Sequence, residues 1–385
     1  MPKRQPPTNP FRYGDLALDD QFTDRAAELK ALKADIRNGQ NVVVFAPRRY
    51  GKSSLVWRAA QELTARREVL IAYVDLLATP SKEKLAEKLA KSIHDDVASP
   101  LMRAREKTAA IFDGLRVRPT VTLNPHDASL SFTFESTARR EDIDATLERL
   151  LELPAQLAAE RRKRTALVFD EFQEILDIDS QLPALLRATF QRQPDVAHVY
   201  LGSKRTMMER LFNDVHEPFW RSAKQMELGL IDPELFRPFI RDRFDRTNRA
   251  IADDVLDELL AVTQGHPYAT QEVCYFLWEE VPEGWSASRD SLERALAGVL
   301  RSESAHFTRI WSQAVPNHRL ILQALAVDPP ARITDGYRRR HALAHDATVR
   351  KALRAMGDDE LVLRDEHGYR IAEPFLAEWI RRFQS

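Results

Sequence analysis

Glycine, cysteine, net charge and long apolar runs are the features that this sequence has least of. Glycine supplies 12 of the 385 residues, below the average of about 7%, so we expect each glycine where the backbone needs its freedom. The single cysteine, Cys274, excludes a disulfide within the chain and fits a reducing cytoplasm. The 57 basic and 58 acidic residues nearly cancel, so no overall field attracts the chain to nucleic acid or to an anionic membrane.

The apolar segments are short. No window approaches ~18 uninterrupted apolar residues, and the first ten residues lack the apolar stretch of a secretion signal. We therefore expect a cytoplasmic protein without a membrane partner. Histidine and cysteine do not cluster at metal-ligand spacing, so we expect no structural zinc. The length suggests two or three domains at ~100–200 residues each.

Five short apolar segments, separated by amphipathic ones, predict the first domain. They are rich in β-branched or aromatic residues and are typical of buried strands, at 41–45, 68–76, 165–170, 196–202 and 224–229. Strands joined by helices pair in parallel, so the pattern predicts a three-layer α/β domain over 1–232. Period-two alternation around 124–129 predicts a β-hairpin excursion within 101–140.

The pattern becomes helical after residue 232 and changes again near residue 316. Four amphipathic stretches predict a helical domain over 233–315. Three short helical stretches, then two extended runs around a charged turn with Gly368, predict a winged helix over 316–385. We therefore expect three domains.

The stretch FAPRRYGKSS, Phe45–Ser54, follows a predicted strand and precedes an amphipathic helix. This context is typical of a P-loop, in which backbone N–H groups and a helix N-terminus bind phosphate, although a Gly-Lys-Ser at a helix start also arises by chance. Lys52 would reach the β- and γ-phosphates, and the Ser53 hydroxyl would bind Mg²⁺. Ala46 stands where the usual loop has glycine, which is tolerated if its φ is negative. The predicted nucleotide contacts in the loop are Ala46, Pro47, Arg48, Arg49, Tyr50, Gly51, Lys52, Ser53 and Ser54.

A second motif, TALVFDEFQEI, ends a predicted strand with two acidic residues. At the carboxyl end of a neighbouring parallel strand, Asp170 would hold Mg²⁺, and Glu171 would orient or deprotonate the attacking water. Two acids at a strand end also occur in solvated turns. The two motifs in this order nevertheless predict a site for ATP or ADP with Mg²⁺.

The two motifs and their surroundings resemble the AAA+-type P-loop ATPases of the archaeal and bacterial family related to STAND signal-transduction ATPases and to origin-recognition ATPases. The resemblance covers nearly the whole chain. The segment QFTDR is similar to the family's adenine-side motif, hydrophobic-Gly-Arg-Glu, which implies that Phe22 and Arg25 contact the base; Asp24 replaces the glycine. The segment TQGHPY resembles the Gly-x-Pro signature of the family's helical lid, which implies that Pro267 packs near the adenine.

The resemblance also implies two residues that sense the γ-phosphate. The stretch VYLGSKRTMMERLF resembles the family's fourth core strand and makes Ser203 the polar sensor, although a strand-end cap is the alternative. The stretch EPFWRSAKQMEL gives Arg221 the place of an arginine finger or γ-phosphate sensor, acting in its own chain or on a neighbouring subunit; pairing with a surface carboxylate is the alternative. With Lys52 and Glu171, these two complete the predicted catalytic set.

Basic residues in the predicted winged helix are candidate DNA contacts. Arg350, Lys351 and Arg354 fall on its presumed recognition helix, where cations would meet phosphates of double-stranded DNA. From Pro316 onward, however, there are 12 Lys and Arg against 10 Asp and Glu. A protein-interaction or autoinhibitory winged helix is therefore the alternative.

The sequence thus predicts an ATPase switch that binds and hydrolyses Mg-ATP and relays its nucleotide state through the helical lid to the winged helix. Two alternatives stay open, namely a nucleotide-dependent DNA-binding regulator of the initiator kind and a nucleotide-held interaction module that does not hydrolyse ATP. The pattern accommodates monomers, dimers and rings.

Overall fold

The computed structural model describes residues 8–18, 21–97, 112, 114–124, 129–134, 139–160, 163–329, 331–365 and 367–384. The chain forms two compact units. The first, here called the sheet unit, consists of Ala26–Ala46 and Lys52–Leu228; the second, here called the helical unit, consists of Met1–Arg25, Pro47–Gly51 and Gly229–Ser385. The loop between residues 46 and 52 thus leaves the sheet unit and returns to it.

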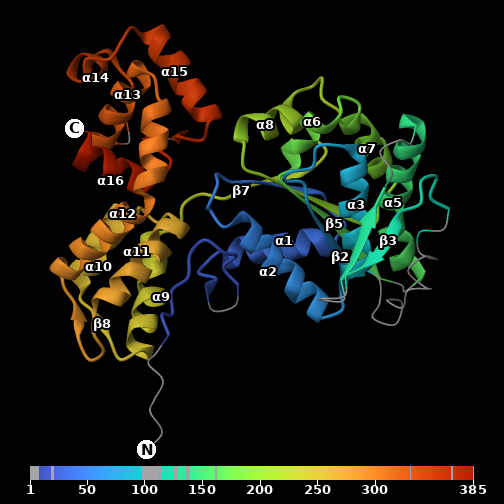
Figure 1. Ribbon diagram of the computed structural model, residues 1–385, viewed down its shortest axis with the longest axis horizontal. Helices are drawn as coiled ribbons and strands as arrows, with labels where there is room; N and C mark the ends of the chain where they lie inside the picture. Colours follow the sequence, from blue (N-terminus) through green and yellow to red (C-terminus); the bar gives the residue numbers. More distant parts are fainter. Residues whose placement is uncertain are drawn as a thin grey trace, which may run out of the picture. The chain divides into compact units, whose positions relative to one another are not determined.

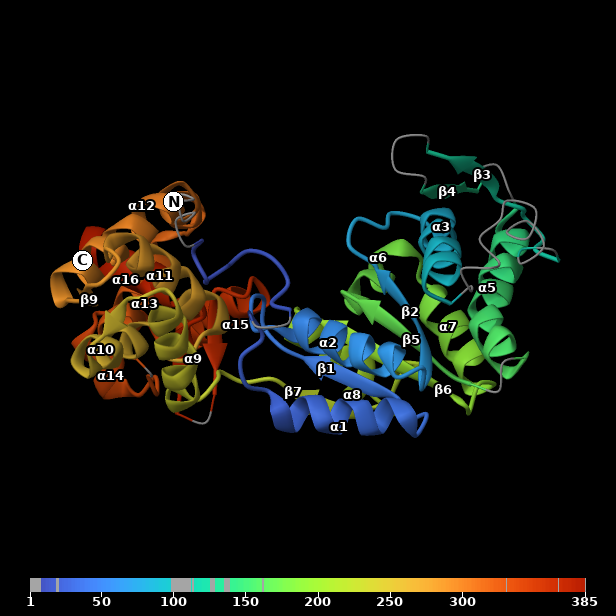
Figure 2. The same cartoon turned by 90° about the horizontal axis from the view of Figure 1, so that it is seen from below.

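A five-stranded parallel sheet forms the centre of the sheet unit (Figure 1). Its strand order is β2-β5-β6-β1-β7, and all five strands are labelled in Figure 2. Every residue of β1 and of β6 is buried, so both faces of the sheet are covered. The five predicted strands and their parallel pairing are confirmed. The strands are β1 (Val42–Phe45), β2 (Val69–Asp75), β5 (Arg164–Asp170), β6 (Val196–Gly202) and β7 (Lys224–Glu227).

Helices connect these strands, as the amphipathic segments predict. Helices α1 and α2 pack on each other, as do α3 and α5, and each pair also contacts the sheet (Figure 2). The helices are α1 (Ala26–Arg37), α2 (Lys52–Ala65), α3 (Lys82–Ser92), α5 (Arg140–Glu160), α6 (Ile175–Ile178), α7 (Leu182–Gln191) and α8 (Arg205–Asn213), with a π-helical turn at Ile93–Val97 and a 3-10 turn at Phe172–Glu174.

The predicted hairpin is present as β3 (Thr120–Leu123) and β4 (Leu130–Thr133), which pair antiparallel. Residues 125–128 of its predicted turn lie outside the described residues. Phe132 of β4 is buried against Phe112, with ring centres 5.3 Å apart. The hairpin is thus anchored to the sheet unit through its apolar side.

The helical unit begins with α9 (Pro233–Arg246), α10 (Asp253–Thr263), α11 (Pro267–Glu280) and α12 (Arg289–Gln313), and the short strands β8 (Ala250–Ile251) and β9 (Ser286–Ala287) pair in parallel beside them. The predicted winged helix follows as α13 (Pro316–Val327), α14 (Asp335–Arg340), α15 (Asp346–Asp358) and the antiparallel strands β10 (Val362–Arg364) and β11 (Tyr369–Ile371). A further helix, α16 (Pro374–Phe383), comes after the wing.

One apolar core runs through the whole helical unit because α16 contacts α10, α12 and α13. Phe11, from the N-terminal segment, is fully buried in this core and lies 5.6 Å from the ring of Phe244. This packing joins the residues predicted as lid and winged helix into one unit, together with an N-terminal segment that we predicted as part of the first domain. The division into three domains stays a prediction. No helix in the described ranges has the length and apolar character needed to cross a membrane.

Candidate nucleotide-binding site

Four side chains at the carboxyl ends of the central strands form one hydrogen-bonded network. Lys52 is the first residue of α2 and is almost fully buried; its Nζ lies 3.0 Å from Glu171 Oε1. The other carboxylate oxygen of Glu171 accepts hydrogen bonds from Ser203 Oγ at 2.8 Å and from Gln173 Nε2 at 2.6 Å. The predicted catalytic residues Lys52, Glu171 and Ser203 therefore lie together. Sequence reasoning missed Gln173, although it lies in the same motif.

The backbone of Glu171 has φ = 52°, in the left-handed region that a glutamate rarely adopts. This turn directly follows β5, so the carboxylate points into the network instead of continuing the strand direction. Burial raises the pKa of Glu171, but the ammonium of Lys52 and the hydrogen bonds from Gln173 and Ser203 outweigh it, so that the net pKa lies below its usual value. Glu171 is therefore an ionised hydrogen-bond acceptor at neutral pH.

Asp170 has three donors of its own. Ser53 Oγ donates to Asp170 Oδ2 at 2.8 Å, and the hydroxyl of Tyr73 donates to the same oxygen at 2.5 Å. The backbone N–H of Glu171 donates to Oδ1 at 2.9 Å. A hydroxyl and a carboxylate oxygen this close are the hard oxygen ligands that Mg²⁺ prefers, so the residues present fit the predicted metal.

The loop residues Pro47–Gly51 have their described side-chain partners within the helical unit. Arg49 Nη1 lies 3.0 Å from Oε1 and 3.2 Å from Oε2 of Glu373, and its guanidinium lies 4.2 Å above the ring centre of Tyr268. Arg48 Nε lies 2.9 Å from Glu360 Oε2. The two arginines of the predicted phosphate loop are thus paired with carboxylates around the wing.

Tyr50 completes these loop contacts. Its hydroxyl accepts a hydrogen bond from Arg370 of β11 at 3.0 Å, and its ring meets that of His266 edge to face with centres 4.9 Å apart. Burial lowers the pKa of His266 to about 3, so the imidazole is neutral and its Nδ1 accepts a hydrogen bond from the N–H of Ala269. His266 caps α11 in this way, and Pro267 occupies the first turn of that helix.

The two positions where this chain replaces a glycine of the family behave differently. Ala46 is not among the described residues with positive φ, so its methyl group is compatible with the loop. Asp24 has φ = 55° and keeps a backbone conformation that glycine adopts readily and aspartate tolerates. The next residue, Arg25, is buried and donates to the carbonyl of Gly229 at 2.5 Å, while Phe22 is half-buried. The base contacts predicted for Phe22, Arg25 and Pro267 stay predictions.

Arg221 does not join the network. It is exposed, has φ = 49°, and its guanidinium lies 5.3 Å from the ring centre of Trp220. In the described part of the chain it forms no ion pair with a surface carboxylate, which was the alternative reading. Its role as an arginine finger or sensor stays a prediction.

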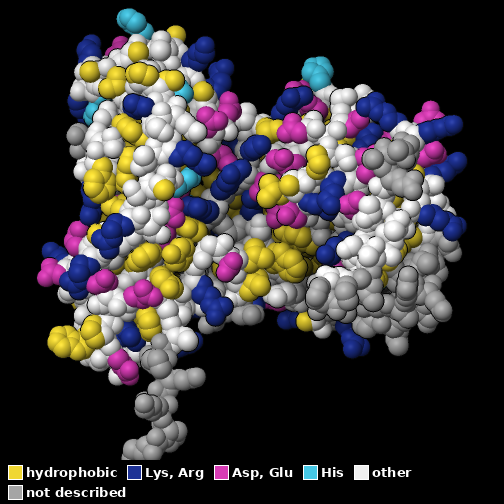
Figure 3. All heavy atoms as spheres, viewed as in Figure 1, with side chains coloured by type: hydrophobic (Ala, Val, Ile, Leu, Met, Phe, Trp, Pro, Cys, Tyr) yellow, Lys and Arg dark blue, Asp and Glu magenta, His cyan; other side chains and the backbone are white. Residues whose placement is uncertain are grey.

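The three candidate DNA contacts share the outer face of α15. Arg350, Lys351 and Arg354 are exposed, whereas Val349 and Leu353 of the same helix are buried. Arg350 Nε lies 2.7 Å from Asp346 Oδ2, one turn earlier on the helix. Basic and acidic side chains are also interspersed over the surface seen in Figure 3. The cations of α15 thus form a local stripe on a surface of mixed charge.

Glu272 of α11 is a buried acid that the sequence analysis did not single out. Its side chain is fully buried and neither carboxylate oxygen has a hydrogen-bond partner among the described residues. Burial, together with the carboxylates of Glu303 and Glu373, raises the pKa of Glu272 to about 8, although Arg49 opposes the shift. Glu272 is therefore largely protonated at neutral pH.

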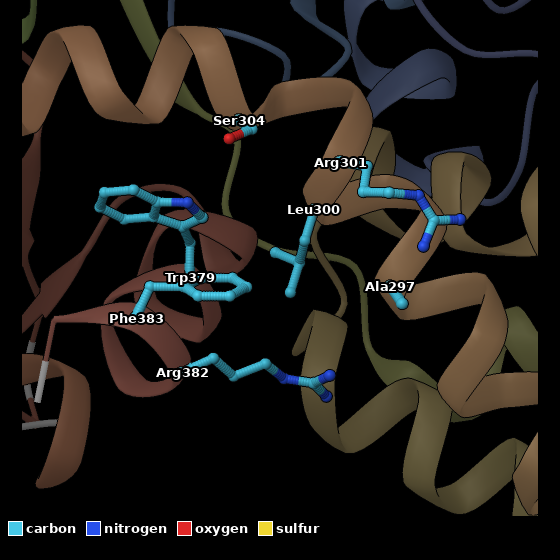
Figure 4. Close-up of a pocket in the computed structure, with 7 residues that line it drawn as sticks. All are labelled: Ala297, Leu300, Arg301, Ser304, Trp379, Arg382 and Phe383. Carbon is cyan, nitrogen blue, oxygen red and sulfur yellow. The ribbon is translucent and has the colours of Figure 1, made fainter.

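A separate pocket of about 520 Å³ lies between α12 and α16 (Figure 4). Its apolar lining consists of Ala297, Leu300, Trp379 and Phe383. Arg382, which also lines it, is paired with Glu378 and Glu293. None of the predicted site residues lines this pocket, so it is distinct from the network around Glu171.

Two family models cover most of the chain. A model described as an ATPase domain predominantly from Archaea matches residues 22–273, and a model of a probable winged helix domain matches residues 305–382. No curated protein matches the chain.

Three solved structures of archaeal proteins have a similar fold. A Walker-type ATPase of Pyrococcus abyssi is 18% identical, with a TM-score of 0.64, over 95% of this chain and 97% of that chain. The ORC2 protein of Aeropyrum pernix, in ADPNP–ADP complexes, is 15% identical, with a TM-score of 0.55, over 97% of this chain and 98% of that chain. The ORC1 protein of Aeropyrum pernix, in complex with DNA, is 14% identical, with a TM-score of 0.50, over 95% of this chain and 94% of that chain. The predicted P-loop fold with a winged helix is confirmed.

Proposed function

Because this chain belongs to the family of ATPase domains found predominantly in Archaea, we propose that it is a switch that binds and hydrolyses Mg-ATP. Its nucleotide state is relayed through the helical lid to the winged helix. Lys52 binds the β- and γ-phosphates, Ser53 and Asp170 hold Mg²⁺, and Glu171 receives a proton from the attacking water. The ion neutralises phosphate charge when it is bound.

The observation that carries the proposal is the network of Lys52, Glu171 and Ser203. The ammonium of Lys52 is buried beside one carboxylate, 3.0 Å away. A bound γ-phosphate competes for this cation, because it carries more negative charge than a single carboxylate. Drawing Lys52 toward phosphate leaves Glu171 held by neutral donors only, and the carboxylate is then able to orient and deprotonate a water.

The first test is ATP binding and steady-state turnover by the purified full chain with Mg²⁺. Binding together with turnover supports the switch, and substitutions in the network, described in the Discussion, assign the roles. Binding without turnover under any condition favours the alternative of a nucleotide-held interaction module. A chain that binds neither ATP nor ADP overturns both readings.

The contacts of Arg48, Arg49 and Tyr50 support the relay to the winged helix. These three residues belong to the predicted phosphate-binding loop, and their side chains contact residues of the wing and of the start of α16. Phosphate oxygens and the carboxylate of Glu373 are alternative partners for the same guanidinium of Arg49. Nucleotide binding that recruits Arg49 thereby weakens one link to the winged helix, and the intact link weakens nucleotide binding.

Replacing Glu373 with glutamine is therefore expected to tighten ATP binding about three- to tenfold. This factor corresponds to the roughly 1 kcal/mol that a partly exposed ion pair contributes, which Arg49 no longer loses when it binds phosphate. Equilibrium titration of a fluorescent ATP analogue measures the change. The matched control is Glu378→Gln, which removes a nearby carboxylate, within α16, that pairs with Arg381 and Arg382 instead. Equal affinities in the wild type, E373Q and E378Q would contradict the relay through Arg49.

DNA binding is the second candidate function, because α15 presents three exposed cations on one face. The structure of the ORC1 protein named above is described in complex with DNA. If α15 contacts duplex DNA, Arg350→Ala and Arg354→Ala should each weaken binding at low salt and reduce the slope of log K against log salt by about one. Arg289→Ala, which removes an exposed cation of α12, serves as the control.

The DNA experiment has a clear negative outcome. A wild-type chain that binds no duplex at low salt, with or without ATP, removes this candidate and leaves a protein partner for the winged helix. Binding that all three alanine variants weaken equally points to diffuse surface charge and not to α15.

A further inference from the structure

Tyr73 of β2 lies beside the predicted Mg²⁺ ligands without being one of them. Strands β2 and β5 pair in register, with Asp75 opposite Asp170, so Tyr73 lies two positions before that pair. Its hydroxyl donates to Asp170 Oδ2 at 2.5 Å. The same oxygen accepts the hydrogen bond from Ser53. Tyr73 is therefore a second side chain that fixes the carboxylate.

The ring of Tyr73 is itself held in place. Trp57 of α2 stacks on it, with ring centres 4.9 Å apart and planes at 28°. Trp57 follows Ser53 by four residues on the same helix, so both side chains lie on one helix face. The face of α2 that carries the predicted metal ligand Ser53 thus also supports the tyrosine that restrains Asp170. Neither Tyr73 nor Trp57 belongs to a motif that the sequence analysis recognised.

We propose that Tyr73 is a positioning residue for Mg²⁺, whose hydroxyl orients the Asp170 carboxylate toward the ion. The inference rests on the proposed function, because it requires a Mg-nucleotide at this site. Carboxylates that bind metals are commonly held by such outer hydrogen bonds, and removing the partner lowers metal affinity by ~10–100-fold. Ser53 is a predicted ligand itself, whereas Tyr73 acts on the ion through Asp170.

The test is the Mg²⁺ dependence of nucleotide binding by Tyr73→Phe, which removes the hydroxyl and keeps the ring on Trp57. A fluorescent ATP analogue is titrated with the full chain in EDTA and at increasing Mg²⁺. The Mg²⁺ concentration at which the analogue's affinity shows half of its Mg²⁺-dependent increase is expected to be about tenfold higher in Y73F than in the wild type. The affinity in EDTA should stay within about twofold of the wild type, because the phosphates and Lys52 are unaffected.

Two further variants separate orientation from packing. Trp57→Phe disturbs the stacking but keeps the hydrogen bond, so its Mg²⁺ requirement should move less than that of Y73F. In an Asp170→Asn background, Tyr73→Phe should have little additional effect, because its partner carboxylate is gone. Equal shifts in Y73F and W57F, or an unchanged Mg²⁺ requirement in Y73F, would overturn the inference.

The same titration distinguishes this inference from the proposed function. A wild-type chain that binds no nucleotide, with or without Mg²⁺, overturns the proposed function and this inference together. A wild-type chain that binds nucleotide more tightly with Mg²⁺, while Y73F behaves identically, overturns the role of Tyr73 alone.

Discussion

Replacing Glu171 with glutamine is expected to lower kcat for ATP hydrolysis by ~10²–10⁴-fold, the usual contribution of a general base. Glutamine keeps the shape of the side chain and its amide oxygen still accepts one hydrogen bond from Gln173 or Ser203, but it cannot take up a proton. The loss of the negative partner of Lys52 leaves that ammonium freer to bind phosphate. The Kd for ATP should therefore stay unchanged or decrease slightly.

Single-turnover hydrolysis and equilibrium ATP binding measure these two quantities separately. The matched control is Asp177→Asn, which removes an exposed carboxylate of α6, close in sequence but outside the network. A normal kcat in E171Q would show that another group activates the water. A loss of ATP binding in E171Q would instead indicate that the variant site has collapsed.

Replacing Lys52 with alanine or methionine is expected to weaken ATP binding by at least ~100-fold, because two charge-assisted contacts to phosphate are lost at roughly 1.5–3 kcal/mol each. Methionine keeps the apolar stem of the buried side chain and changes mainly the charge. Without the ammonium, Glu171 loses the largest of the interactions that lower its pKa, so its pKa should rise relative to the wild type. Turnover should fall with binding in both variants.

Calorimetric titration with ATP and Mg²⁺ measures the affinity, and thermal unfolding reports whether the variants are folded. Arg58→Ala is the matched control, because Arg58 also lies on α2 and pairs with Glu62, outside the network. If K52M is folded and binds ATP as tightly as the wild type, the loop does not bind phosphate through Lys52, and the proposed function is wrong.

Local patterns were enough to predict the sheet and the two nucleotide motifs. The segment 165–170, for example, is a short apolar run of the kind that forms a buried strand. Parallel pairing follows because helices separate the five predicted strands in the sequence. Glu171 directly follows β5, and Lys52 begins the helix after the loop that follows β1. The carboxyl ends of these parallel strands share one edge of the sheet, so the two side chains lie at the same edge. Helix α16 was not predicted, although Pro374 in its first turn and Arg381 and Arg382 in its last turn are typical start and stop signals of a helix.

The pairing of the loop arginines could not be predicted in the same way. Arg49 and Glu373 are 324 positions apart, and no periodicity or motif connects them. The stacking of Trp57 on Tyr73 and the unpartnered burial of Glu272 likewise depend on which helix faces meet. The sequence by itself determined the five strand segments, the phosphate loop and the acidic end of β5, because these depend on residues close together in the chain. Only the tertiary structure decided which carboxylates the loop arginines contact and which hydroxyl holds Asp170, because those contacts depend on the packing of distant segments.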